Sequence, residues 1–189
     1  MVSPRSGVRL MAWPMLMGGD DEVYMIKLEN ILVATDFGEA SESALSYGRA
    51  LARNFGARLH VMHVVENALM WTGLESVALD IASVQAEMEE AARKKLAELI
   101  DDDDRLSLQA KTIVRTGTTP AFELVSYAKE VNIDLIIMGT HGRGAMAHLL
   151  MGSVAEKVVR TAPCPVLTLR SPEHEFVMPD ALQIVARAQ

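Results

Sequence analysis

The sequence predicts an α/β fold, in which a single doubly wound, five-stranded parallel sheet carries helices on both faces. Two observations lead to this prediction. Short runs of apolar and β-branched residues, which are typical of strands buried on both faces, recur five times along the chain. Stretches with the periodicity of amphipathic helices separate these runs, and such alternation is typical of a parallel sheet covered by helices.

The first two strands are the clearest. Residues 30–35 (NILVAT) and 59–65 (LHVMHVV) are short and apolar, and each predicts a buried strand. Between them, residues 41–55 have helical spacing of their apolar positions. Gly56 directly follows and is interpreted as the helix stop, since glycine readily adopts the left-handed conformation that ends helices.

A long helix is expected over 76–100. Its apolar positions form one stripe, which consists of Val84, Met88, Ala92, Leu96 and Leu99. Four consecutive aspartates at 101–104 end the helix, and we interpret them as a solvated loop. A cation site is the alternative, although nothing in the sequence spaces these carboxylates around an ion.

The third strand is expected over 110–115 and the fourth over 133–138. The helix between them begins with Thr119 as N-cap and Pro120 at the first helical position. Its inward-facing residues are predicted to be Ala121, Leu124, Val125 and Ala128.

The last helix is expected over 154–162 and the fifth strand over 165–169. Pro163 stops the helix, because the residue before a proline avoids the α region. The order of elements is therefore βαβαβαβαβ. In such sheets a ligand binds beyond the carboxyl ends of the strands, where the direction of the connections reverses.

Three parts of the chain are distinguished by composition. Residues 1–25 are interpreted as an extension ahead of the domain, with a signal peptide as the alternative. Residues 26–170 form the domain. Residues 171–189 are a tail in which 181–188 could form one short helix.

Composition and charge limit the function. The chain has 189 residues, half of them hydrophobic, so one domain with a sizeable core is expected. A net charge of −7 argues against a protein that coats nucleic acid or binds membranes through a polybasic surface. Cys164 is the only cysteine, which excludes an intrachain disulfide framework and is typical of a reducing compartment, so a cytoplasmic location is expected.

A glycine-rich loop follows the fourth strand. Residues 139–153 read GTHGRGAMAHLLMGS, with Gly139, Gly142 and Gly144 after the strand and Gly152 and Ser153 before a helix. Without a Cβ, glycine lets backbone N–H groups approach phosphate oxygens, and a helix start adds further N–H groups. No Gly-Lys-Ser/Thr occurs, so this is not a Walker A loop.

The spacing Gly-x2-Gly-x9-Gly-Ser/Thr, with the flanking VATD, DLIIMGTHGRG and CPVL, resembles the ATP-binding branch of the universal stress protein family over residues 28–170. The resemblance implies strand order 3-2-1-4-5 and ATP bound beside strands one and four. It also implies a homodimer formed through strand five. The strand-five residues are Val166, Leu167, Thr168 and Leu169.

The same resemblance implies a set of nucleotide contacts. Backbone amides in the glycine pattern would hold the phosphates, Ala34, Thr35 and Asp36 would line the adenosine, and Val64 would contact adenine. The full expected set is Ala34, Thr35, Asp36, Val64, Met138, Gly139, Gly142, Arg143, Gly144, Gly152, Ser153 and Val154.

Several of these residues have a plainer alternative. Ser153 and Glu156 form the capping-box pattern S-x-x-E, so the serine could cap the helix without touching a ligand. Asp36 could cap the turn after its strand. Arg143 is the only cation in the loop and is expected either to pair with a γ-phosphate or to lie exposed.

Outside the expected contacts, His60 and His63 both lie within the second predicted strand. They are interpreted as packing or sheet-edge residues rather than metal ligands.

The function hypothesis is an ATP-binding regulatory protein of the stress response, with ATP accompanied by magnesium or manganese. No catalytic residue is assigned, and at most slow ATP hydrolysis is expected, because a Walker lysine and a water-orienting residue are missing from the sequence pattern. The alternatives are a nucleotidyl-transfer or ATP-hydrolysing enzyme on the same fold, and a dimerisation module that no longer binds nucleotide.

Overall fold

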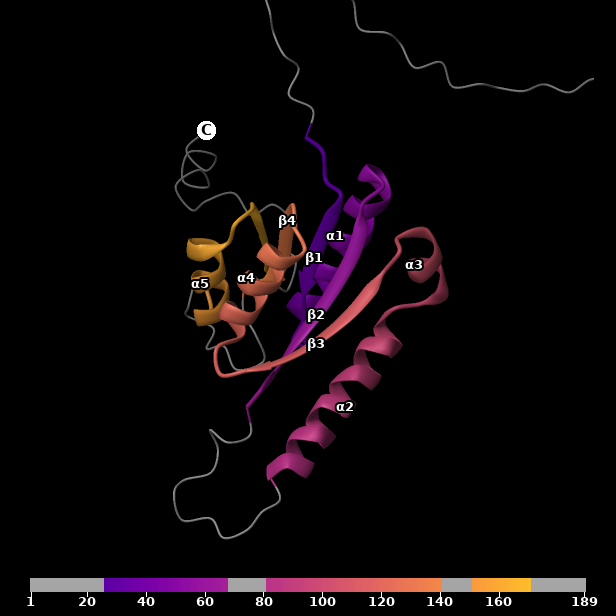
Figure 1. The fold of residues 1–189 in the computed structure, drawn as a ribbon. Coiled ribbons are helices and arrows are strands. Elements are labelled where there is room, and N and C mark those ends of the chain that lie inside the picture. Colours follow the sequence, from indigo (N-terminus) through magenta and orange to yellow (C-terminus); the bar gives the residue numbers. More distant parts are fainter. Residues whose placement is uncertain (1–25, 68–80, 141–150, 171–189) are drawn as a thin grey trace, which may run out of the picture.

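The computed structural model describes residues 26–67, 81–140 and 151–170. Five strands and five helices occur within these ranges (Figure 1). Their order is β1 (Asn30–Ala34), α1 (Glu39–Phe55), β2 (Arg58–Glu66), α2 (Ile81–Leu99), α3 (Asp102–Ser107), β3 (Lys111–Gly117), α4 (Pro120–Glu130), β4 (Leu135–Gly139), α5 (Ser153–Thr161) and β5 (Val166–Leu169).

The strands form one five-stranded sheet in the order β3-β2-β1-β4-β5, and every neighbouring pair is parallel. Both the fold class and the predicted strand order are confirmed. Since β1 connects to β2 on one side and the chain later returns to β4 on the other, the direction of the connections reverses between β1 and β4. That is the position where open parallel sheets bind ligands.

Successive side chains of β1 point to opposite faces, so two separate cores form. Ile31 and Val33 pack with α1 and the end of α2 on one face. Leu32 and Ala34 pack with α4 and α5 on the other. Figure 1 shows α4 and α5 together on one side of the sheet and α2 on the opposite side. The doubly apolar strand runs in the sequence therefore correspond to strands covered on both faces.

Helix α1 packs unusually close to the sheet at Gly48. A Cβ atom at this position would lie 2.4 Å from Cγ2 of Val33 and 3.4 Å from Cδ1 of Leu59. Since real Cβ atoms do not approach carbon to 2.4 Å, the helix can lie at this distance only because residue 48 has no side chain.

The local signals for two helix ends are confirmed. Gly56 ends α1 in the left-handed conformation, with φ of 65°. Thr119 is the N-cap of α4 and Pro120 its first residue, although the threonine side chain makes no capping hydrogen bond. The predicted inward face of α4 is buried, namely Ala121, Leu124, Val125 and Ala128.

Helix α2 differs from its prediction. Within the described residues it begins at Ile81, and residues 76–80 lie outside them. Ala92 and Leu96 are buried as predicted, but Val84 is 41% exposed. Met88 and Leu99 are half-buried, so the stripe is fully buried only at Ala92 and Leu96.

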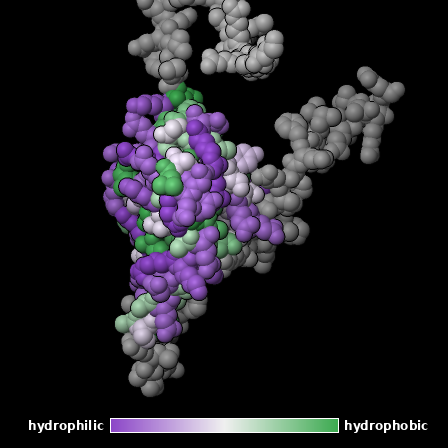
Figure 2. Space-filling view, turned by 90° about the vertical axis from the view of Figure 1, so that its right-hand side faces the viewer, coloured by the Kyte–Doolittle hydropathy of each residue, from purple (hydrophilic) through white to green (hydrophobic). Residues whose placement is uncertain are grey.

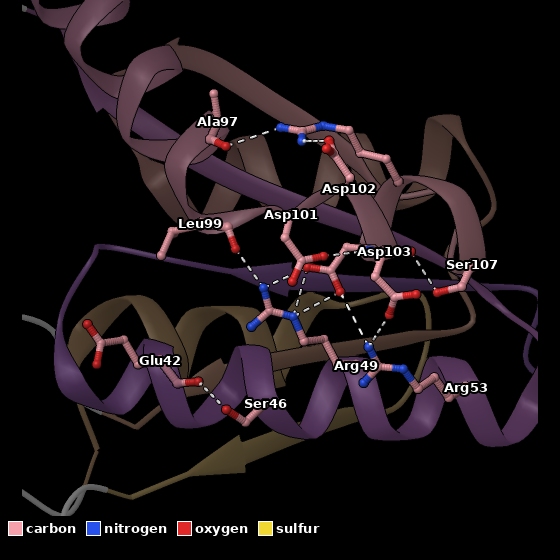
Figure 3. Close-up of polar contacts among 12 residues, drawn as sticks. Glu42, Ser46, Arg49, Arg53, Ala97, Leu99, Asp101, Asp102, Asp103 and Ser107 are labelled. Carbon is pink, nitrogen blue, oxygen red and sulfur yellow. Dashed lines mark hydrogen bonds and ion pairs between the residues drawn. The ribbon is translucent and has the colours of Figure 1, made fainter.

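The four aspartates are not a solvated loop, and this prediction was wrong. Asp101 is the N-cap of α3 and accepts a hydrogen bond from the amide of Asp104 at 2.8 Å. Asp104 is fully buried and binds Arg49 of α1 (Figure 3). Arg49 also donates from Nη2 to the carbonyl oxygen of Leu99 at 2.6 Å, so one side chain joins α1, the end of α2 and α3.

Hydrophilic residues cover most of the molecular face on the side of α2 and α3, and hydrophobic residues show between them in small groups (Figure 2). Among the helices that the structure describes, none has the length and apolar character needed to cross a membrane. The possible helix over 181–188 lies outside the described residues.

Candidate functional site

The ends of three neighbouring strands define the candidate site. Ala34, the last residue of β1, is paired with Met62 of β2 on one side and with Met138 of β4 on the other. Ala34 and Met138 are 9% and 5% exposed and face the core that α4 and α5 cover, and Val64 packs partly buried against the same core. These three residues therefore lie on the same face of the sheet, near the carboxyl edge where the connections reverse.

The turn after β1 satisfies its own polar groups. The amide of Phe37 donates to Oγ1 of Thr35 at 3.0 Å, and the amide of Gly38 donates to Oδ1 of Asp36 and to Oγ of Ser41, both at 3.1 Å. Ser41 gives its only hydroxyl proton to the carbonyl of Gly38 at 2.8 Å, so the Thr35 hydroxyl is the donor in the 3.0 Å bond between the two side chains. This turn is held from within and is not a cradle of amides for phosphate.

Asp36 therefore has the local role that the sequence left open, because its carboxylate accepts from the turn two residues on. Thr35 is 7% exposed, and its amide donates to the carbonyl of Met62 at 2.9 Å. The Thr35 hydroxyl is thus occupied by the turn. The backbone of Thr35 and Asp36 lies at the carboxyl edge of the sheet, directly after β1.

The segment after β4 is closed at its base by two backbone hydrogen bonds. Thr140 directly follows β4, and its amide donates to the carbonyl of Leu169 in β5 at 2.7 Å. The carbonyl of Thr140 in turn accepts from the amide of Gly152 at 2.7 Å. The two ends of the predicted glycine pattern, Gly139 and Gly152–Ser153, are thereby brought together at the carboxyl edge. Gly142, Arg143 and Gly144 lie outside the described residues.

Helix α5 starts beside this closure. Gly152 is its N-cap, with extended backbone (φ −75°, ψ 156°), and its carbonyl accepts from the amide of Glu156 at 2.9 Å. Ser153 is the first helical residue and is exposed, one residue earlier than the predicted start. Because Gly152 is the cap and no side-chain capping bond forms, the capping-box alternative for Ser153 is wrong.

The first-turn amides of α5 point out of its start, since the first N–H groups of a helix have no partner within it. Those of Ser153 and Val154 lie next to the base of the glycine segment. The helix dipole adds a partial positive charge there, which favours an anion by roughly 0.3–1 kcal/mol when exposed. The amide of Gly152, by contrast, is engaged with Thr140.

The two histidines of β2 are packing residues, as one of the sequence interpretations held, and neither lies at a sheet edge because β2 pairs on both sides. His60 is 3% exposed and shares a 2.7 Å hydrogen bond between Nδ1 and the hydroxyl of Tyr127 in α4. His63 lies at the site: Nδ1 is 2.8 Å from the carbonyl oxygen of Thr35, and its ring lies against that of Phe37.

Sequence reasoning missed Phe37 and the contact of His63 with the turn. The sequence held a partial signal for His63 alone, because it directly precedes Val64, a predicted adenine contact near the end of the strand. Within the described ranges, no group of three or more histidine, cysteine, aspartate or glutamate side chains could hold a metal ion.

Comparison with known proteins gives one consistent result. The sequence model of the universal stress protein family matches residues 27–170. A universal stress protein of Methanocaldococcus jannaschii is 30% identical over 148 residues, which are 78% of this chain and 85% of that protein. A universal stress protein of Thermus aquaticus is 34% identical over 144 residues, covering 75% and 98% of the two chains.

Solved structures agree. The universal stress protein UspA from Lactobacillus plantarum is 26% identical, with a TM-score of 0.62 over 77% of this chain and all of that one. Two more distant solved universal stress proteins are described as complexes, one with cAMP (22% identity, TM-score 0.49) and one from Archaeoglobus fulgidus with dAMP (20%, TM-score 0.49). They cover 76% and 77% of this chain and 98% and 99% of their own. The matched span of the family model and the two relatives at 30% and 34% identity show that the chain belongs to the universal stress protein family.

Proposed function

We propose that this protein is an ATP-binding regulatory member of its family, which responds to stress through the conformation that bound ATP favours. One observation carries the proposal: the amide of Gly152 donates to the carbonyl of Thr140 at 2.7 Å. This bond joins the two halves of a complete Gly-x2-Gly-x9-Gly-Ser pattern at the edge where parallel sheets bind ligands.

The phosphates would be held by backbone amides. Gly139 and Gly142 supply positions without a Cβ, and the amides of Ser153 and Val154 supply the start of α5. A phosphate contact through the amide of Gly152 would have to share the bond that this amide makes with Thr140. Arg143 and Gly144 complete the expected phosphate side, the arginine by pairing with the terminal phosphate.

The adenosine would lie over the strand ends. Ala34, Val64 and Met138 offer a largely apolar floor, and Asp36 offers a carboxylate at the rim. That carboxylate, which also accepts from the amide of Gly38, is the candidate partner for a ribose hydroxyl. Magnesium or manganese would enter with ATP, since phosphate oxygens and water can supply most ligands of such ions.

Binding of ATP would act by shifting the population of conformations of the 139–153 segment. A ligand that contacts both ends of the 139–153 segment favours the arrangement in which those ends are together, and this changes the surface that the segment presents. At most slow hydrolysis is proposed, because the chain has no Walker lysine to stabilise charge during phosphoryl transfer.

A homodimer through β5 is part of the proposal. Among the described strands β5 pairs with β4 alone, and all four of its residues are half-buried. The carbonyl of Pro165 accepts from Ile136 of β4 and that of Leu169 from Thr140 just after it, so the backbone groups of Val166 and Thr168 alternate to the other edge. An open edge of this kind is suited to pairing with a second strand.

Calorimetric titration with ATP and magnesium tests the site. Wild type is expected to bind, and Gly142→Val is expected to bind at least tenfold more weakly, because its side chain enters the space of the phosphates. Gly56→Ala is a destabilising control: its φ of 65° makes a side chain costly there, but the residue lies at the opposite end of the sheet, so ATP affinity should not change. Equal affinity in wild type and Gly142→Val would refute the phosphate site.

The products of a long incubation separate the alternatives. ADP and phosphate, formed slowly, agree with the proposal. AMP and pyrophosphate would identify nucleotidyl transfer instead. Absence of ATP binding together with a stable dimer would identify a dimerisation module.

A further inference from the structure

The backbone at Phe37 is strained. Its φ is 64°, in the left-handed region, which a bulky residue adopts only at a cost. Of the described non-glycine residues, Gln109 and Asn132 also have positive φ, but Phe37 is the aromatic one and lies in the turn that carries Asp36. Strain of this kind persists only where the surroundings fix the conformation.

Contacts from two other elements fix it. The ring of Phe37 lies against the ring of His63 from β2, with centroids 4.4 Å apart and planes tilted by 41°. On α2, the ammonium of Lys95 stands 5.4 Å from the centre of the same ring, within cation–π distance. The turn after β1 is therefore clamped between β2 and α2 through one aromatic side chain.

His63 also holds the backbone of the turn directly. Its Nδ1 is 2.8 Å from the carbonyl oxygen of Thr35, at the point where the pairing of β1 with β2 ends. Because a carbonyl only accepts, Nδ1 must carry the proton. One imidazole thus fixes the residue before Asp36 by a hydrogen bond and the residue after it by ring contact.

We propose that His63 is a positioning residue, which sets the place of the Asp36 carboxylate at the nucleotide-binding edge without touching the ligand. The effect on affinity rests on the proposed function, whereas the effect on the turn does not. Strand β2 would then have two roles. Val64 offers part of the apolar surface for the adenosine, and His63 holds the turn that carries Asp36.

Two substitutions separate the two contacts. His63→Asn keeps an amide donor near the place of Nδ1 and removes the ring, whereas His63→Phe keeps a ring and removes the donor. Val61→Ala, in the same strand and fully buried, is a destabilising control that leaves the turn alone. Each variant is measured by hydrogen exchange at the amides of Phe37 and Gly38 and by ATP titration.

The hydrogen exchange of both amides is expected to accelerate about tenfold in His63→Phe, and ATP binding is expected to weaken about five- to tenfold, the scale of one lost hydrogen bond. His63→Asn should retain part of both. Val61→Ala should lower the stability of the fold. It should not accelerate exchange at Phe37 and Gly38 more than in the rest of the sheet, and it should not change the affinity for ATP. In an Asp36→Asn background the ATP penalty of His63→Phe should disappear, because the carboxylate that it positions is gone.

The outcomes are separable. If wild type binds ATP and both His63 variants bind equally well, the positioning role is overturned and the proposed function stands. If wild type does not bind ATP, the proposed function fails, and exchange at Phe37 and Gly38 still decides whether His63 holds the turn. Unchanged exchange in His63→Phe overturns the inference in either case.

Discussion

Arg49 of α1 donates hydrogen bonds from two of its nitrogens to the buried carboxylate of Asp104, although 55 positions separate the two residues in the sequence. Nε lies 3.0 Å and 2.9 Å from the two carboxylate oxygens, and Nη2 lies 2.7 Å from Oδ2 (Figure 3). Asp104 is fully buried, whereas the Arg49 side chain is 25% exposed. Removing one member of such a pair leaves a charge without its partner, which is the costly case for buried ion pairs.

Asp104→Asn is therefore expected to lower the free energy of unfolding by about 3 kcal/mol. Asp103→Asn, the same substitution one residue earlier, is the matched control. Its pair with Arg53 has both side chains at least half exposed, so a loss of less than about 1 kcal/mol is expected. Urea denaturation measures both, and equal losses would show that burial does not govern this network.

The stability of the fold should depend on pH through His60. Burial, helped by the nearby cations Lys111 and Arg58, lowers the pKa of His60 from 6.5 to about 4. The unfolded chain therefore binds a proton between these values while the folded chain does not. This contribution to stability is present above pH 6.5 and is lost as the pH falls toward 4, by about 3 kcal/mol in total.

Urea titrations at pH 7.5 and pH 5 test this dependence. His60→Asn places an amide near Nδ1, within reach of Tyr127, and removes the titrating group. Its absolute stability will differ from that of wild type, so the change with pH is the quantity to compare. The variant should lose about 2 kcal/mol less than wild type over this interval. The same change in both proteins would assign the pH dependence to other groups.

The hydrogen bond from the amide of Gly152 to the carbonyl of Thr140 can be tested by removing only its donor. Gly152 has φ of −75°, which proline can adopt, so Gly152→Pro removes the N–H group with little change of backbone. Gly152→Ala keeps the N–H group and is the control. The proline variant should bind ATP up to about tenfold more weakly, the scale of one hydrogen bond, and the alanine variant should bind nearly as wild type.

Calorimetry on the two Gly152 variants gives the answer. Equal affinities would mean that the bond to Thr140 does not help to assemble the site. An equal loss of ATP affinity in both variants would mean that the added Cβ atom, and not the removal of the N–H group, weakens binding.

The proposed dimer is tested at Thr168. Its amide faces the edge of β5 away from β4, which no other described strand pairs, so Thr168→Pro removes a donor from that edge and leaves the pairing with β4 intact. Thr168→Ala keeps the amide. Light scattering should give twice the chain mass of 20.6 kDa for wild type and for the alanine variant, and a single chain mass for the proline variant. A monomeric wild type, or a dimeric proline variant, would contradict pairing through β5.

Most of the fold was predictable because its signals are local. Each strand is a short apolar run, and Gly56, Thr119 and Pro120 mark helix ends by their own backbone preferences. The order of the strands is not local, and its prediction rested on the family resemblance. The start of α5 was misplaced by one residue, because Ser153 followed by Glu156 imitates a cap that Gly152 supplies.

The errors arise where the deciding partner is remote in sequence. Four aspartates in a row are typical of a solvated loop, and the sequence does not show that Arg49 of α1 pairs with the buried Asp104. Val84 follows the helical period of α2, yet it is 41% exposed, because the period alone does not show which turns of a helix meet the sheet. At the site, Ala34, Asp36 and Val64 were expected at the edge, whereas the left-handed backbone of Phe37 was not, because phenylalanine, unlike glycine, has no preference for that conformation.

The missing side chain at Gly48 has an evolutionary consequence. With a Cβ at 48 only 2.4 Å from Val33, the two positions must change together. Relatives that carry alanine or serine at 48 should carry alanine or glycine at 33, and an alignment deep enough to show covariation should join this pair. A side chain added at 48 without a smaller residue at 33 would push α1 off β1, and with it the turn between them.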